Sequence, residues 1–201
     1  MRRRLFAAIC AAPLLAVARP TLAAPSPAPV TWAIDRGHSE VSFRIRHLLT
    51  KVRGTFGDFH GTITADPDAW QDASIDVEIR SASISTENAK RDAHLRSSDF
   101  FAADSFPTIS FRSTRIERRG GDAKIYGMLT MRGITRPVVL DARFGGVTRA
   151  ANEERVAVTA TTTLDRLAWG VKWNRAAEGG GAVLDDIVDV ELTVEAVRTP
   201  H

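Results

Sequence analysis

Apolar and polar residues alternate along most of this chain, and this alternation limits its fold more than any other feature. The clearest run, residues 188–195, reads VDVELTVE, with an apolar residue at every second position. The same period runs through residues 41–47, 75–80, 109–114, 123–132, 138–144 and 156–162. Successive side chains of a β-strand point to opposite faces, so these segments predict strands with one buried and one solvated face. Such strands are typical of antiparallel sheets.

The number and length of the predicted strands favour a closed barrel over a two-layer sandwich. Residues 31–34 and the glycine-containing stretch 52–64 bring the total to eight or nine strands. A sheet with one buried face must close on itself or find a second layer, and closure removes its exposed edges. Glycines that can bend a strand lie within the patterns, at Gly54, Gly57, Gly61, Gly127 and Gly145. We therefore expect an all-β domain, an antiparallel barrel of eight or nine strands, with the sandwich as the alternative.

Two stretches do not fit a strand. Residues 86–101 contain strong helix formers between Thr86 and the pair Ser97–Ser98, and they predict a short helix over one barrel mouth. Residues 170–185 include three consecutive glycines at 179–181, which indicate a loop.

The first residues have the order of a secretory signal peptide. Arg2–Arg4 form a basic segment, residues 5–17 are largely apolar, and small residues surround Leu22. The apolar run is shorter than the roughly 20 residues that span a bilayer, so no stable membrane span is expected, although an anchor is the alternative. The expected organisation is a signal peptide at 1–23, a flexible tether at 24–30 and a folded domain at 31–198. This order predicts that the protein is secreted.

The basic character of the chain comes largely from the predicted signal peptide. The full sequence has 27 Lys and Arg against 24 Asp and Glu. Removal of residues 1–23 takes away four arginines and no acid, which leaves 23 against 24. A nearly neutral domain gives no reason to expect nucleic acid as a partner. Cys10 lies in the same segment, so the mature domain has no thiol for disulfides, catalysis or metal binding.

The remaining polar residues do not form a recognisable catalytic or metal motif. The five histidines lack paired ligand spacing, so no metal is expected. His47 falls on the apolar face of its strand, where we expect a core histidine, or else one that hydrogen-bonds a polar ligand group. Arg91, Asp92 and His94 lie close together and either bind a ligand head group at the mouth or tie the helix to the strands. No serine lies in a nucleophile-elbow sequence, so no enzyme activity is expected.

Aromatic residues fit two interpretations equally well. The residues that can point inward are Phe43, Phe56, Phe59, Phe111, Phe144, Trp169 and Trp173. They are consistent with a ligand cavity and with a barrel filled by its own side chains.

Several segments together resemble the YceI-like family. They are WAIDRGHSEVSF at 32–43, RGTF at 53–56, ADP at 65–67, RDAHLRSSDFF at 91–101, FPTISFRST at 106–114, GMLTMRGITRPV at 127–138 and DR at 165–166. The ordered set covers residues 31–197. The RDAHL block is the most specific part. Trp169–Gly170 departs from the Phe-Gly common in the family, and its larger ring could shorten a cavity.

The resemblance implies a lipocalin-like up-and-down antiparallel barrel of about eight strands that holds a polyisoprenoid or similar long-chain lipid, without a cofactor or a metal. It also implies export to the periplasm. Carried onto this sequence, the lipid-binding residues are Phe43, Ile45, His47, Phe56, Ile75, Val77, Phe111, Ile125, Leu129, Leu140, Phe144 and Trp169. Arg91, Asp92 and His94 are expected near the mouth. YceI-like barrels can pair, so a homodimer is possible.

Three functional hypotheses follow. The first is a non-catalytic lipid carrier or store, which requires a continuous apolar cavity. The second is an enzyme on such a lipid, with Asp92 and His94 as acid and base converging on the cavity. The third is a stress-related interaction protein with a packed barrel and no cavity.

Overall fold

The computed structural model describes residues 28–66, 69–150, 153–176 and 183–200. The predicted signal peptide and the glycines at 179–181 lie outside these ranges. The described residues form strands β1 (Val30–Ile34), β2 (Glu40–His47), β3 (Thr50–Phe56), β4 (Phe59–Asp66), β5 (Ala69–Arg80), β6 (Ile84–Ser85), β7 (Thr108–Arg119), β8 (Asp122–Met131), β9 (Ile134–Ala150), β10 (Glu153–Asp165) and β11 (Leu184–Arg198), helix α1 (Ala89–Arg96) and three short 3-10 turns, Arg36–His38, Ser81–Ser83 and Arg166–Trp169.

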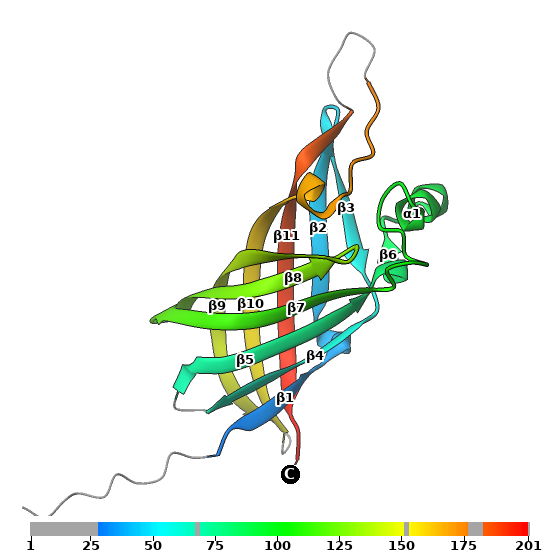
Figure 1. Ribbon diagram of the computed structural model, residues 1–201. Helices are drawn as coiled ribbons and strands as arrows, with labels where there is room; N and C mark the ends of the chain where they lie inside the picture. The colour runs from blue at the N-terminus through cyan, green and yellow to red at the C-terminus, as the bar shows by residue number, and fades with distance from the viewer. Residues whose placement is uncertain (1–27, 67–68, 151–152, 177–182, 201) are drawn as a thin grey trace, which may run out of the picture.

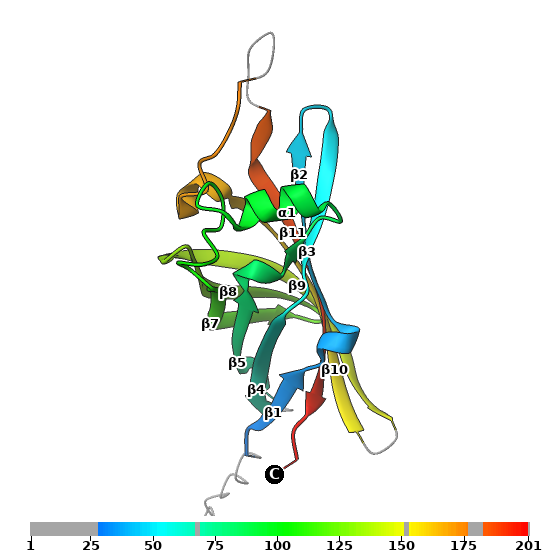
Figure 2. The ribbon, with the colours of Figure 1, turned by 90° about the vertical axis from the view of Figure 1, so that its right-hand side faces the viewer.

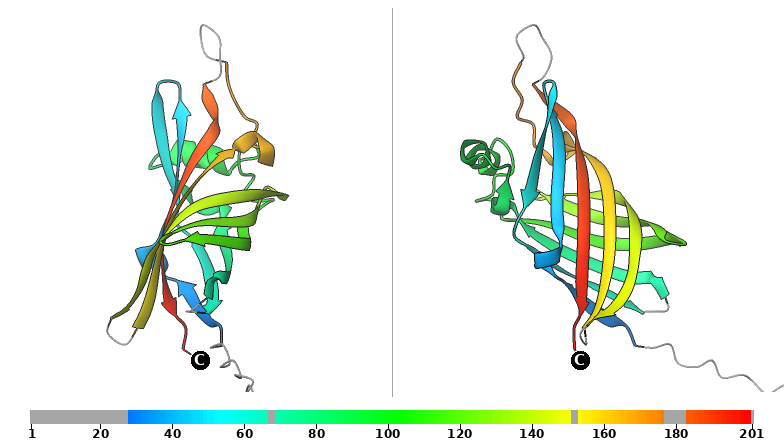
Figure 3. Two further views of the ribbon diagram at one scale, coloured as in Figure 1. Left: turned by 90° about the vertical axis from the view of Figure 1, so that its left-hand side faces the viewer. Right: turned by 180° about the vertical axis from the view of Figure 1, so that it is seen from behind.

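These strands close into an eight-stranded antiparallel barrel, as the alternation predicts (Figure 1). Strands β1 and β2 lie end to end along β11, which pairs with β1 through residues 196–198 and with β2 through residues 184–193. The predicted strand at 52–64 is likewise divided, because β3 pairs with β2 whereas β4 pairs with β1. Strands β5 and β7 to β10 complete the wall. Figure 3 shows β2, β11, β10 and β9 side by side along one side.

Oppositely charged side chains pair across neighbouring strands on the outer face. Arg44 bonds Glu191 at 2.9 Å, and Lys124 bonds Asp141 at 2.6 Å. Each of these four side chains is between 46% and 68% exposed. Such exposed pairs contribute little to stability. They keep the outer surface polar, so the apolar positions of the same strands face inward.

One end of the barrel is filled by side chains. Trp32 is fully buried there, and its ring lies 5.0 Å from that of Trp70, which in turn lies 4.9 Å from Phe144. The surrounding cluster contains Val30, Ile63, Ala65, Ala73, Val156 and Ala196. We call this the closed end. It fixes the direction from which anything can enter the barrel.

Helix α1 lies at the opposite end, between the β2–β3 hairpin and the segment after β10 (Figure 2). The side chain of Asn88 caps it by accepting a hydrogen bond from the backbone N–H of Arg91. The helix lies between Thr86 and Ser97, as the sequence predicts, and Ser97 is its C-cap. No helix in the described part of the chain is long and apolar enough to cross a bilayer.

Candidate functional site

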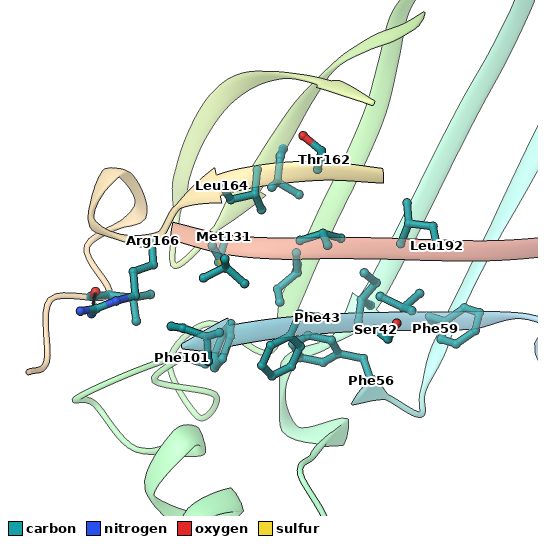
Figure 4. Close-up of a pocket in the computed structure, with 18 of the residues that line it drawn as sticks. Ser42, Phe43, Phe56, Phe59, Phe101, Met131, Thr162, Leu164, Arg166 and Leu192 are labelled. Carbon is teal, nitrogen blue, oxygen red and sulfur yellow. Dashed lines mark hydrogen bonds between the residues drawn. The ribbon is translucent and has the colours of Figure 1, made fainter. Parts of the chain in front are cut away.

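A cavity of about 850 Å³ occupies the barrel interior between the closed end and α1. Its walls are apolar side chains from the inner face of the strands, joined by residues of α1 and of the 171–173 segment. Figure 4 shows Phe43, Thr162 and Leu192 projecting from three different strands around this space. The volume lies within the range of small-molecule binding sites.

Ten of the twelve residues expected at a lipid site line this cavity. They are Phe43, Ile45, His47, Phe56, Ile75, Val77, Phe111, Ile125, Leu129 and Leu140. Their positions follow from the strand period, because each is an inward position of β2, β3, β5, β7, β8 or β9. The structure thus brings together residues that are up to about a hundred positions apart in sequence.

Phe144 and Trp169 lie outside the cavity lining, which corrects the placement expected from the sequence. Phe144 lies beyond the cavity at the closed end, where its ring packs at a tilt against that of Trp70. Trp169 is 3% exposed in a 3-10 turn, and its indole Nε1 donates a hydrogen bond to the carbonyl oxygen of Leu129 at 3.2 Å. Its larger ring packs against Val138 and Met131, which line the cavity, and is not itself part of the lining.

His47 lines the cavity but is not a core histidine, so the expected burial is wrong. It is the last residue of β2, where the hairpin extends past the barrel, and its side chain is exposed. Strand period alone places it on the inner face. The length of the hairpin beyond the barrel wall decides its exposure, and the period carries no information about that length.

Asp92, Thr86 and Arg91 form one hydrogen-bonded unit at the mouth. Asp92 is 6% exposed, and its Oδ1 accepts hydrogen bonds from the Thr86 N–H at 2.8 Å and the Thr86 hydroxyl at 2.5 Å. Arg91 donates from Nε to the Thr86 hydroxyl oxygen at 2.7 Å and from Nη2 to the Thr86 carbonyl at 2.8 Å. Thr86 and Arg91 line the cavity, whereas Asp92 holds them from behind. The unit ties α1 to the end of β6 and fixes the Arg91 guanidinium at the mouth.

His94 belongs to a separate cluster that joins α1 to the segment after β10. Its Nε2 lies 2.8 Å from Asp99 Oδ2, and its ring meets Phe100 and Trp173 edge-on at 5.0 Å each. Phe100 and Trp173 are themselves 5.2 Å apart. His94 and Asp92 thus turn to different partners, and they do not form the acid and base pair that the enzyme hypothesis requires.

The charged side chains among the described lining residues are basic, and none is Asp or Glu. Arg166 is 4% exposed and uses its guanidinium to bond the carbonyls of Val171, Trp173 and Asp185 and the Asp186 carboxylate. It thereby fastens the segment after β10 to the start of β11. Lys90 and Arg91 have no carboxylate partner in the described part of the chain, so the mouth carries positive charge.

Asp35, His38 and Glu195 bring three potential metal-ligand atoms within 4.8 Å of one another outside the barrel. The Arg155 Nη1 donates to Asp35 Oδ2 at 3.1 Å and to Glu195 Oε1. Hydrogen bonds from His38 above all, with others from Gly37 and Arg155, hold the pKa of Asp35 below its ordinary value of 3.8, against a smaller effect of burial. These carboxylates therefore face a bound guanidinium, and the cluster is an ion-pair network.

Several cavity residues were not singled out from the sequence. From β10 and β11 these are Val158, Leu164, Val188, Val190, Leu192 and Val194. Their signal was present, since both strands alternate cleanly. Val171 and Leu95 line the cavity from irregular or helical segments, where period two gives no prediction.

The fold and this interior define a class: a closed antiparallel barrel with an apolar internal cavity open toward one end. The YceI-like domain model matches residues 32–196, and the chain belongs to that family. A UPF0312 protein of Staphylococcus aureus (strain USA300) is 32% identical over 167 residues, which cover 82% of this chain and 95% of the relative.

Solved structures agree on the fold. The YceI protein of Campylobacter jejuni is 29% identical, with a TM-score of 0.67 over 77% of this chain and 90% of its own. A polyisoprenoid binding domain from Saccharophagus degradans has a TM-score of 0.61 over 85% of this chain and 99% of its own. Its 13% sequence identity limits that likeness to the fold.

Proposed function

We propose that this protein binds a long-chain polyisoprenoid, or a similar amphiphilic lipid, inside the barrel without catalysing a reaction on it. The observation that carries the proposal is the apolar cavity of about 850 Å³, walled by inward side chains of the barrel strands. The polyisoprenoid binding domain of similar fold supports the choice of ligand class.

Burial of the lipid tail provides enough free energy for such binding. Each buried methylene contributes roughly 0.8 kcal/mol, so a five-carbon isoprene unit contributes at most about 4 kcal/mol. A few units would reach the range of tight complexes once the costs of ordering the chain are subtracted. The tail can thus dominate affinity, and a nearly neutral protein can serve this function.

The two alternatives have less support. The packed-barrel hypothesis requires an interior filled by side chains, which conflicts with the cavity. The enzyme hypothesis requires both Asp92 and His94 to converge on the cavity. His94 lines the cavity and pairs with Asp99, whereas Asp92 is not among the described lining residues and bonds Thr86.

We further propose that the protein is exported to the periplasm, with residues 1–23 removed as a signal peptide. The support is the order of basic, apolar and small residues in that segment. There the domain would carry, store or protect its lipid. The mass of the protein recovered from a bacterial periplasm tests this proposal, because cleavage after Ala23 fixes the expected mass.

Trp173 offers a direct test of lipid binding, because its side chain lines the cavity. An isoprenoid quinone added to delipidated protein should quench Trp173 fluorescence with saturation. The variant Trp173→Phe isolates this signal from the other tryptophans by difference. We expect the difference signal to show saturable quenching by the quinone with its prenyl tail. A quinone without the tail should produce no such quenching. A linear, non-saturating response in both proteins would contradict it.

A further inference from the structure

The turn between β2 and β3 exposes two large apolar side chains beside the cavity mouth. Leu49 is 98% exposed and Leu48 is 50% exposed. Turns of this kind ordinarily carry Gly, Asn, Asp or Ser. Leu48 also adopts a left-handed backbone with φ of 52°, a conformation that leucine rarely takes. Two leucines at this tip are therefore unexplained by the needs of the turn.

The leucine tip adjoins the entrance to the cavity. His47 and Thr50, the residues on either side of the two leucines, both line the cavity. The Leu48 N–H donates a hydrogen bond to the Val183 carbonyl at 2.8 Å, and the Val183 N–H donates to the Arg175 carbonyl at 3.0 Å. These hydrogen bonds hold the hairpin tip beside the segment after β10, and we call the two together the rim; both reach toward the top of Figure 1.

Positive charge accompanies the leucines on this rim. Lys172 and Arg175 are exposed on the segment after β10, and Lys90 and Arg91 lie across the mouth on α1. None of the four side chains has a carboxylate partner in the part of the chain that the structure describes. Glu87 is an exposed acid on the same side, so the rim is not exclusively basic, but its basic side chains outnumber this acid. By contrast, the cations lower on the hairpin are neutralised, for example Lys51 by Asp189 at 2.9 Å.

Apolar tips and unpaired cations together match the surface of an anionic bilayer. The apolar side chains enter the boundary between head groups and acyl chains, and the cations meet lipid phosphates. The closed end is filled by Trp32, Trp70 and Phe144, so a lipid reaches the cavity through the mouth. A water-insoluble ligand has to come from a membrane, and a rim that contacts the membrane would place the mouth against the source.

We propose that the leucine tip, Leu48 and Leu49, and the rim cations Lys90, Arg91, Lys172 and Arg175 dock the protein onto anionic bilayers during lipid exchange. This inference rests on the proposed function, because it assigns the membrane as the direct donor or acceptor of the cavity lipid. The partner is a lipid surface and not another protein.

Vesicle binding tests the docking surface. The variant Leu48→Asn/Leu49→Ser removes the apolar tip, and Asn tolerates the left-handed backbone at position 48. Its matched control is Val139→Ser/Val147→Ser, which removes two apolar side chains that are 38% and 44% exposed on β9. A second variant, Lys172→Gln/Arg175→Gln, is compared with Arg118→Gln/Arg119→Gln on β7. Each protein is sedimented with vesicles of phosphatidylcholine alone or mixed with phosphatidylglycerol.

The wild-type protein should bind the mixed vesicles at least tenfold better than pure phosphatidylcholine, and salt should weaken that binding. The tip variant should lose at least tenfold in binding to mixed vesicles, and the cation variant should lose the preference for phosphatidylglycerol. Both controls should bind like the wild type. Equal vesicle binding by the tip variant and the wild type would overturn the proposal.

Lipid uptake separates this proposal from the proposed function. The rate at which a fluorescent prenol moves from mixed vesicles into the barrel should fall at least tenfold in the tip variant. The amount of prenol bound at equilibrium, supplied from a cyclodextrin complex without vesicles, should equal that of the wild type. If the wild-type protein binds prenol but does not bind vesicles, the docking proposal is overturned and the proposed function stands. A wild-type dimer that the tip variant abolishes would assign the leucines to a second copy of the chain and overturn docking as well.

Discussion

Asp92 holds Thr86 by two hydrogen bonds, one from the backbone N–H at 2.8 Å and one from the hydroxyl at 2.5 Å. Through this contact a buried carboxylate on α1 fixes the end of β6, and Thr86 in turn orients Arg91 at the cavity mouth. Arg91 and Asp92 of the RDAHL block therefore serve to position the helix.

Replacing Asp92 should lower stability without abolishing lipid binding. Asp92→Ala leaves two buried donors of Thr86 without their acceptor, and we expect the free energy of unfolding to fall by about 2–4 kcal/mol. Asp92→Asn keeps an acceptor oxygen and should cost less. Denaturant unfolding measures both changes. A folded Asp92→Asn protein that loses a lipid-modifying activity present in the wild type would instead support the enzyme hypothesis.

Gly127 is required by the close approach of Phe111 from the neighbouring strand. A Cβ at position 127 would lie 2.4 Å from two ring carbons of Phe111 and 2.6 Å from the Arg112 carbonyl oxygen. Gly127→Ala should therefore cost about 1–3 kcal/mol in unfolding free energy. Gly57 serves as the control because a Cβ there meets nothing within 4 Å. Equal decreases in the melting temperatures of Gly127→Ala and Gly57→Ala would show that the Phe111 contact is not responsible.

Two adjacent threonines on β10 lie on opposite faces of the barrel wall. Thr162 lines the cavity and Thr163 is exposed on the other face. Thr162→Phe should fill part of the cavity and reduce affinity for a long prenol at least tenfold. Thr163→Phe adds the same side chain outside and should bind normally. Prenol titrations, with circular dichroism as a check of folding, distinguish the two. Equal affinities would place the lipid somewhere other than this cavity.

Acid should weaken the fold through Asp35. The pKa of Asp35 lies below its ordinary value, chiefly because of its hydrogen bond with His38. A carboxyl whose pKa is lower in the folded state stabilises the protein above its unfolded pKa, and this contribution disappears as the pH falls through the folded pKa. The unfolding free energy should thus decline between about pH 5 and pH 2. In Asp35→Asn the decline should be shallower. Superimposable pH profiles of the two proteins would contradict this role.

Strand period predicted the fold and most of the cavity wall, because each inward position of a barrel strand faces the same interior. Leu164 and Leu192 obey that period as well as Phe43 does, although neither is among the lipid-binding residues predicted from the sequence. Phe144 also points inward, but whether an inward residue meets a cavity or a plug depends on Trp70 of another strand. That pairing is a property of the tertiary structure.

The mouth was less predictable for a related reason. His94, Phe100 and Trp173 meet only because α1 and the segment after β10 lie together, and no local pattern reports that contact. The exposure of His47 and Leu49 depends on how far the β2–β3 hairpin extends past its neighbours. Sequence period identifies faces of strands, and it leaves the ends of strands undetermined.

Native mass spectrometry of protein recovered from a periplasm without detergent tests the central claim most directly. We expect a stoichiometric adduct that solvent extraction identifies as an isoprenoid or similar long-chain lipid. The same preparation of Thr162→Phe should carry much less of it, and Thr163→Phe should carry as much as the wild type. A wild-type protein that is free of lipid, and that takes up no isoprenoid quinone or prenyl alcohol on incubation, would contradict the proposed function.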